Sequence, residues 1–218
     1  MLKAGKVLVG FLILLMAGAC TAPPSATPTV TATIPAATVK AVALTPNPAS
    51  CVLSPIIVPT RPATTPGYTE LDPSAGLHMT GTPQEIDVTT YRLKVTGKVE
   101  RPLSLTYDDL RCLPKIQTSA VLICPGFFED EANWAGASLM SVLDMAGVQP
   151  EATSLLLVGA DQYATSVTLQ QARTGNNHLA YEWEGKPIPI LHGFPVRAVF
   201  PSLQGNTWVK WLVEIQVE

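Results

Sequence analysis

Alternation of apolar and polar residues predicts several strands in the second half of the chain. In TYRLKVTG, residues 90–97, every second residue after the first is apolar, and the run ends at Gly97. A period of two is typical of a strand with one buried face. Similar runs, bounded by turn residues, predict further strands at 153–161, 162–169, 178–190 (with a turn at 184–185), 194–200 and 209–217.

Short helices are expected between these strands. In LSLTYDDL, Thr106 is placed as the N-cap, and two aspartates follow in the first turn. GASLMSVLDMAGV has leucine and valine at helical spacing, and Gly147 follows the last turn. A further short helix is predicted around 169–173. Strands outnumber helices without regular alternation, so the predicted class is α+β, with mixed β-sheets and short helices.

One apolar run carries a cysteine to its end. Residues 120–123, AVLI, lead to Cys124 and a Pro-Gly turn. This pattern predicts a short buried strand that stops at a loop. A free cysteine commonly packs as a small apolar residue, but strand ends are also where ligands and substrates bind. The run alone leaves both interpretations open.

The first twenty residues have the features of an export signal. Lys3 and Lys6 precede an uncharged apolar run, residues 7–19. A membrane-spanning helix needs about 20 apolar residues, so this run suits a signal peptide better. It ends in LMAGAC, which resembles the bacterial lipobox, in which Cys20 would be lipidated. We predict a lipoprotein signal peptide over 1–20, with an uncleaved N-terminal anchor as the alternative.

Residues 21–66 differ in composition from the rest. They are mostly Thr, Pro and Ala, with Lys40 and Arg61 as the charged residues. Such a segment favours extended conformations and buries too little to fold alone. We predict a disordered stalk, of which CVLSPIIVP can pack on the following domain. Residues 67–218, about 150, then form a single domain.

Charge and cysteine content narrow the possible partners. The net charge of −3 and the scattered basic residues argue against nucleic acid as a partner, and we expect a monomer. With Cys20 assigned to the lipid, three cysteines remain in an oxidising compartment. A disulfide between Cys51 and Cys112 is the expected pairing, and it would leave Cys124 free.

Three short motifs follow one another along the domain. Cys124 lies ten residues before the segment Trp134-Ala135-Gly136, at which we expect a helix to begin. HGFPVRAVFP contains His192 and Arg197, and GNTWVKWL contains Lys210. This order and spacing resemble the molybdopterin-binding domain of the sulfite oxidase family, which includes the catalytic subunit of periplasmic methionine sulfoxide reductase.

The resemblance covers about residues 77–218 and implies a Mo-molybdopterin site. Cys124 would bind molybdenum, for which a soft thiolate is a suitable ligand. Arg197 and Lys210 would grip the cofactor phosphate through a planar fork and a point charge. The implied cofactor-binding residues are Met79, Thr80, His192, Arg197, Trp208, Val209 (with Trp208, through backbone amides) and Lys210.

Two further segments are implicated by the same resemblance. GLHMTGTPQEID resembles the segment that crosses the pterin, so Met79, Thr80 and Gly81 would meet the cofactor, with His78 beside them. Asp161, at the end of LLLVGAD, falls near a cofactor-facing loop position and is equally well a turn residue.

The segment after the cysteine departs from the family pattern. Sulfite oxidases continue into GNRR, whose arginines form an anion pocket, whereas this chain continues into PGFFEDEAN. A mouth formed by Phe127, Phe128 and Glu129 would repel sulfite and favour a neutral or cationic substrate. We expect neither a haem domain nor an immunoglobulin-like dimerisation domain. The predicted signal peptide lacks twin arginines. Because this cofactor is normally inserted in the cytoplasm before the folded protein is exported, their absence argues against a loaded cofactor.

The predicted function is that of an extracytoplasmic, membrane-tethered molybdopterin oxidoreductase. It would move an oxygen atom and two electrons on a small substrate, and it would need an electron-transfer partner. The alternative is a binding or structural lipoprotein that keeps the fold without the cofactor.

Overall fold

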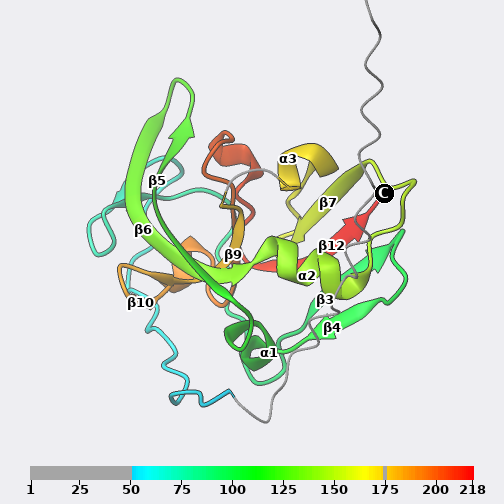
Figure 1. The fold of residues 1–218 in the computed structure, drawn as a ribbon. Helices are drawn as coiled ribbons and strands as arrows, with labels where there is room; N and C mark the ends of the chain where they lie inside the picture. The colour runs from blue at the N-terminus through cyan, green and yellow to red at the C-terminus, as the bar shows by residue number, and fades with distance from the viewer. Residues whose placement is uncertain (1–50, 174–175) are drawn as a thin grey trace, which may run out of the picture. The chain divides into compact units, whose positions relative to one another are not determined.

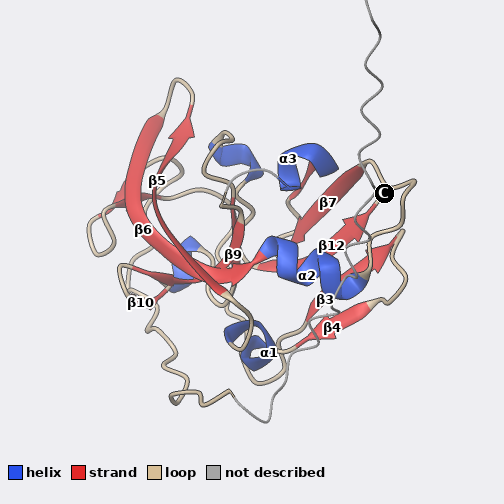
Figure 2. Ribbon diagram, viewed as in Figure 1, coloured by secondary structure: helices blue, strands red, loops and turns tan. Residues whose placement is uncertain are grey.

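A computed structural model describes residues 51–173 and 176–218. The predicted signal peptide, Cys20 and residues 21–50 of the predicted stalk lie outside the described residues. The described part of the chain contains two five-stranded sheets, a two-stranded hairpin and a few short helices (Figures 1 and 2). The predicted α+β class with mixed sheets is therefore confirmed. Within the described ranges, no helix is long and apolar enough to span a membrane.

The first sheet holds the hairpin that ends at Cys124. Its strand order is β10–β9–β6–β5, with β11 also paired to β9, and all of these pairs are antiparallel. The strands are β5 (Lys115–Cys124), β6 (Phe128–Ser138), β9 (His178–Trp183), β10 (Lys186–Pro187) and β11 (Arg197–Val199).

The second sheet places the C-terminal strand at its centre. Its order is β4–β3–β12–β7–β8, and β12 pairs parallel to β3 but antiparallel to β7. The strand predicted from alternating apolar and polar residues in 90–97 is confirmed, since the apolar Leu93 and Val95 are fully buried. The strands are β3 (Leu93–Gly97), β4 (Leu103–Leu105), β7 (Ser154–Gly159), β8 (Ala164–Thr168) and β12 (Leu212–Val217).

Short elements connect the sheets. Thr106 caps α1 through a capping box with Asp109, and Gly147 ends α2 in the left-handed region, as predicted. A small hairpin, β1 and β2, precedes both sheets. The elements are β1 (Leu71–Asp72), β2 (Leu77–His78), α1 (Tyr107–Arg111), α2 (Leu139–Ala146), α3 (Leu169–Arg173), η2 (Ile190–His192) and η3 (Gly205–Thr207).

Two local predictions around the cysteine strand are wrong. The strand is not short and buried: β5 runs for ten residues, and Val121 and Ile123 are exposed. Trp134 does not open a helix either, because β6 continues to Ser138, whose side chain caps α2. The reason is tertiary pairing, since β6 bonds to β5 on one side and to β9 on the other. A Cβ at Gly136 would collide with the β9 carbonyl of Leu179.

The predicted disulfide and packing segment are both present. Cys51 and Cys112 form a disulfide with a Cα–Cα distance of 5.7 Å. Arg111 donates to the carbonyl of Ser54 at 2.7 Å, and Ile56 packs against the hydrophobic core. Residues 51–56 of the predicted stalk are therefore attached to the domain.

Candidate active site

A cavity of about 250 Å³ lies against the inner face of the β5–β6 hairpin. Residues from β2, β5, β6, β11, η3 and the loops after β2 and β7 contribute to it, so it depends on segments far apart in the sequence. Its wall is formed by Tyr68, His78, Thr80, Gly81, Leu122, Cys124, Phe128, Asp130, Asp161, Tyr163, Arg197, Gly205, Asn206, Trp208 and Lys210.

Cys124 presents its thiol to this cavity. It is the last residue of β5 and shares the inner face with Ala120 and Leu122, which are buried. Its partner in the strand register is Phe128, which also lines the cavity. Among the described cysteines it is the one outside a disulfide, and it is partly exposed.

Arg197 brings a guanidinium into the same cavity. It is the first residue of β11 and only 4% exposed. Its guanidinium carbon lies 5.0 Å from the ring centre of Trp134 and 5.9 Å from that of Trp208. Nη1 donates to the carbonyl of His192 at 3.3 Å, whereas Nε has no hydrogen-bond partner among the described residues. Burial lowers the pKa of Arg197 to about 10, so it stays charged at neutral pH.

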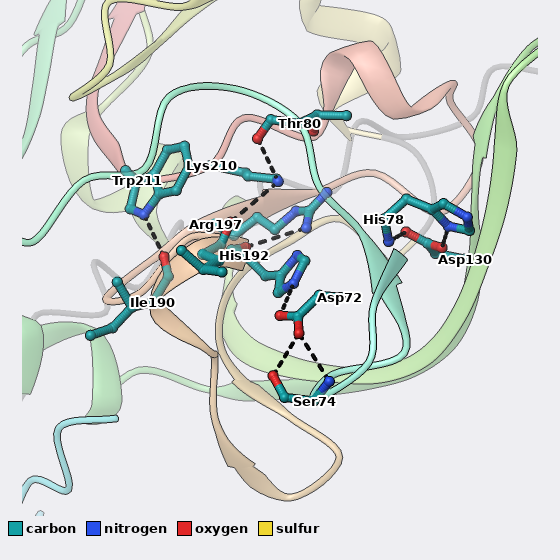
Figure 3. A network of polar contacts seen from close by, with 11 residues as sticks. Asp72, Ser74, His78, Thr80, Asp130, Ile190, His192, Arg197, Lys210 and Trp211 are labelled. Carbon is teal, nitrogen blue, oxygen red and sulfur yellow. Dashed lines mark hydrogen bonds and ion pairs between the residues drawn. The ribbon is translucent and has the colours of Figure 1, made fainter. Parts of the chain in front are cut away.

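Lys210 is the second buried cation. Its ammonium donates to the carbonyls of Thr80 at 2.8 Å and Leu191 at 3.4 Å (Figure 3). Burial, followed by the charge of Arg197, lowers the pKa of Lys210 well below its ordinary value. Neither cation forms an ion pair with a carboxylate among the described residues. Buried charge without a counter-ion is unfavourable, so this part of the cavity suits an anion.

His192 lies behind the cations rather than on the cavity wall. It is fully buried, and its Nε2 is 3.0 Å from Oδ2 of Asp72. Burial and then the charge of Lys210 lower the pKa of His192 to about 3, so the ring is neutral. A neutral ring that donates Nε2–H to a carboxylate has an unprotonated Nδ1, and no group in the described part of the chain bonds to that atom. In this arrangement His192 has no spare N–H for the cofactor, so the structure does not favour direct cofactor binding by His192.

The other predicted cofactor residues separate into two groups. Thr80, Gly81 and Trp208 line the cavity, whereas Met79 and Val209 are buried outside its wall. The amides of Trp208 and Val209 donate to carbonyls within η3, so they are not spare donors for a phosphate. Trp208 contributes its ring, and Met79 packs with Leu191 and Trp211.

A second buried carboxylate, Asp130, was not predicted. It is 5% exposed and accepts from the backbone N–H of His78 at 2.9 Å, while its other oxygen is 2.6 Å from Nδ1 of that ring. The imidazole stacks on Phe128 with ring centres 4.5 Å apart. A signal was available, because Asp130 alternates with Ala132 and Trp134 on what proves to be the inner face of β6.

The predicted mouth of the site needs correction. Strand alternation turns Phe128 inward but leaves Phe127, which is 70% exposed, and Glu129 outside the cavity wall. Tyr68, Tyr163 and Asn206 line the cavity instead, and no motif or periodicity in the chain pointed to them.

Two of these wall residues are fixed by hydrogen bonds. Burial raises the pKa of Tyr163, and its neutral hydroxyl donates to the carbonyl of Asn206 at 2.8 Å. Asp161 accepts from the amide of Tyr163 at 3.2 Å, as a turn residue does, and it also lines the cavity.

Residues 78–218 match the family model described as the oxidoreductase molybdopterin binding domain. The chain belongs to this family. It is 31% identical over 141 residues to the uncharacterized oxidoreductase YuiH of Bacillus subtilis, covering 64% of this chain and 71% of that protein. The resemblance seen in the motifs is therefore confirmed, and the chain is a molybdenum-cofactor-dependent oxidoreductase.

Larger relatives contain this domain as a part. Rat mitochondrial sulfite oxidase is 36% identical over 163 residues, which cover 61% of this chain but 30% of that enzyme. The sulfane dehydrogenase SoxCD of Paracoccus pantotrophus matches in structure with a TM-score of 0.60 and 26% identity, over 73% of this chain and 50% of that one. The chain thus spans 30% of the one protein and 50% of the other.

The cavity residues fit the molybdopterin group of this family. Arg197 and Lys210 have N–H groups without partners in the described protein, which a phosphate can satisfy. The described residues contain no group of three His, Cys, Asp or Glu side chains that could hold a metal. Molybdenum at Cys124 would therefore need further ligands from the cofactor, and the pterin dithiolene would supply them.

Proposed function

We propose that this molybdopterin-binding domain works outside the cytoplasm on a lipid anchor. There it transfers an oxygen atom and two electrons on a small neutral or cationic substrate. One observation carries the proposal: the thiol of Cys124 and the cation pair Arg197–Lys210 line the same cavity. A metal ligand and a phosphate grip are thereby combined in one site.

Different residues would bind different parts of the cofactor. Arg197 and Lys210 would bind the phosphate, and Cys124 would ligate molybdenum. Bound Mo-molybdopterin supplies the oxygen-atom and two-electron chemistry. The rings of Trp134 and Trp208 lie within cation–π distance of the Arg197 guanidinium and help to hold it in place.

The choice of a non-anionic substrate rests on the groups around the thiol. Cys124 is bordered by Phe128 and lies within electrostatic range of Tyr163, both neutral. The carboxylates on the cavity wall belong to Asp130 and Asp161. Once the cofactor phosphate occupies Arg197 and Lys210, these two carboxylates would disfavour a dianion such as sulfite relative to a neutral sulfoxide in the same cavity.

Metal and pterin analysis tests the proposed activity. The full chain is expressed with ample molybdate, extracted from membranes and purified. We expect about one molybdenum and one pterin per chain, and a higher kcat/KM for a neutral sulfoxide in reduction than for sulfite in oxidation. Absence of both molybdenum and pterin would instead support the cofactor-free lipoprotein.

The anchor is tested separately. LMAGAC after an apolar run motivates lipidation of Cys20, and several acyl chains would hold the protein firmly on a membrane. We expect wild-type chains to incorporate a palmitate analogue and Cys20→Ser chains to lose that label. A Cys20→Ser variant that is still labelled would contradict the lipobox interpretation.

A further inference from the structure

The outer face of the β5–β6 hairpin is apolar along β5 and acidic along β6. Val121 and Ile123 point outward and are 37% and 43% exposed. Their partners in the register are Glu131 and Glu129, both exposed. Side chains of paired antiparallel residues share a face, so each aliphatic side chain lies beside a carboxylate.

The tip of the hairpin extends this surface toward the active site. Phe127 is 70% exposed, and its amide donates to the carbonyl of Cys124 at 3.0 Å. Ile123 is bonded covalently to Cys124. Ile123 and Phe127 are thus joined directly to the proposed metal ligand, one by a peptide bond and the other by a backbone hydrogen bond.

The strand that carries this surface has an unpaired edge. β5 ends the strand order of its sheet, and among the described residues no further strand pairs with it. In Figure 1 the β5–β6 hairpin projects beyond the other strands of that sheet. Such an edge with exposed apolar residues is suited to contact with another protein.

The charges on this face have no counter-charge paired with them in residues 51–173 and 176–218. Glu129 and Glu131 form no ion pair in the described structure. Glu184 lies alongside, where its carboxylate accepts from the amide of Asn133 at 2.7 Å. Lys115, the basic residue of the hairpin, stands at its opposite end and pairs with Glu182 at 2.6 Å.

We propose that this outer face, formed by Val121, Ile123, Phe127, Glu129 and Glu131, docks a cationic one-electron carrier protein. An apolar centre with a charged rim is typical of protein interfaces, and the acidic rim selects a basic partner. A second copy of the chain fits less well, because a symmetric contact of this face with itself would bring like carboxylates together.

The inference rests on the proposed function, because oxygen-atom transfer requires an electron partner. Reduction of an oxidised substrate takes two electrons and two protons, and it releases one water with the transferred oxygen. Two reduced carriers then supply one electron each and are oxidised in turn. Oxidation of a substrate reverses every step, with water as the oxygen source and two oxidised carriers as the acceptors.

Binding of a basic c-type cytochrome to the purified full chain tests the surface. We expect Glu129→Gln with Glu131→Gln to slow association about tenfold at low salt and to flatten its salt dependence. Phe127→Ser should raise the dissociation constant about tenfold, mainly through faster dissociation. Molybdenum and pterin contents should not change, since these side chains lie outside the cavity wall.

Matched controls lie elsewhere on the domain. Ile57 is 70% exposed, as Phe127 is, and Glu151 is exposed without an ion pair in the described structure. The proposal would be overturned if Ile57→Ser and Glu151→Gln changed cytochrome binding as much as the hairpin variants do. It would also be overturned if the hairpin variants did not change cytochrome binding. A dimer that Phe127→Ser dissociates would overturn it in favour of self-association.

The two proposals fail in different ways. A wild-type chain without molybdenum or pterin that still binds the cytochrome through the hairpin would remove the proposed activity but retain the docking surface. A chain that contains molybdenum and pterin, but whose cytochrome binding is unchanged by the hairpin substitutions, would retain the proposed activity and remove the docking surface.

Discussion

Nε2 of His192 and Oδ2 of Asp72 meet at 3.0 Å across 120 residues of sequence, and both side chains are buried. The same carboxylate accepts from the amide and hydroxyl of Ser74 at 2.9 and 2.7 Å. The carbonyl of His192 in turn accepts from Arg197. The β1–β2 hairpin is therefore coupled to the loop that positions Arg197, the proposed phosphate-binding cation (Figure 3).

Asp72→Ala should destabilise the cofactor-free domain. It removes a buried acceptor from His192 and Ser74, and hydrogen bonds to charged groups contribute about 1.5 to 3 kcal/mol each. Urea unfolding should show a loss of about 2 to 4 kcal/mol. Leu71→Ala is the control, because its side chain is 51% exposed. An equal loss in both variants would contradict a specific role for the Asp72–His192 contact.

Stability should fall between pH 7.5 and 5 because of His192. Its folded pKa of about 3 lies below the ordinary value of 6.5, so below pH 6.5 the unfolded chain binds more protons. Stability therefore decreases on acidification, by about 2 kcal/mol at pH 5 for this one group. Burial also lowers the pKa of His178, which adds to the same trend.

The contribution of His192 can be isolated by substitution. His192→Gln cannot titrate in this range, so its unfolding free energy should change less between pH 7.5 and 5 than that of the wild type. Asp72 does not titrate in this pH range. Burial raises its pKa, but hydrogen bonds from Ser74 and His192 outweigh burial, so the folded pKa of Asp72 lies below the ordinary value of 3.8. An unchanged pH dependence in His192→Gln would show that other groups control acid sensitivity.

Arg197 and Cys124 should affect the cofactor differently. Arg197→Ala removes a charge-assisted phosphate contact of about 1.5 to 3 kcal/mol, so pterin retention should weaken at least tenfold. Arg197→Lys should restore it only in part, because an ammonium lacks the planar fork. Cys124→Ser should abolish turnover and lower metal content while much of the pterin stays bound.

Separate measurements of molybdenum and pterin in the three purified variants decide this point. Full pterin in Arg197→Ala together with complete pterin loss in Cys124→Ser would mean that the thiol, and not the cation pair, retains the cofactor.

The disulfide should contribute strongly to stability. Cys51 and Cys112 are 61 residues apart, and the chain-entropy model assigns about 4 kcal/mol to a loop of that length. The double variant Cys51→Ala, Cys112→Ala should unfold at lower urea, and reductant should lower the midpoint of the wild type but not of the variant. Identical midpoints for oxidised and reduced wild type would refute this estimate.

Native alkylation should modify Cys124 before any other described cysteine. It is partly exposed and unpaired, whereas Cys51 and Cys112 are bonded to each other. Mass spectrometry after brief labelling identifies the site, and cofactor loading should protect Cys124 if it ligates the metal. Faster labelling of Cys112 would show that the roles of the cysteines are reversed.

The chain alone determined those features that depend on neighbours in sequence. Thr106 and Gly147 cap their helices as predicted, because capping involves residues within one turn. The alternation before Gly97 gave a correct strand. The order of the cysteine, HGFPVR and VKW motifs was sufficient to identify the family.

Only the tertiary structure decided which side chains share a space. Strand pairing on both sides kept Trp134 in β6 and beneath Arg197, where local pattern had suggested a helix start. It also joined His78 to Asp130 over 52 residues and His192 to Asp72 over 120. Such contacts are absent from any local window, because they form only when packed sheets bring distant segments together and burial makes each polar group require a partner.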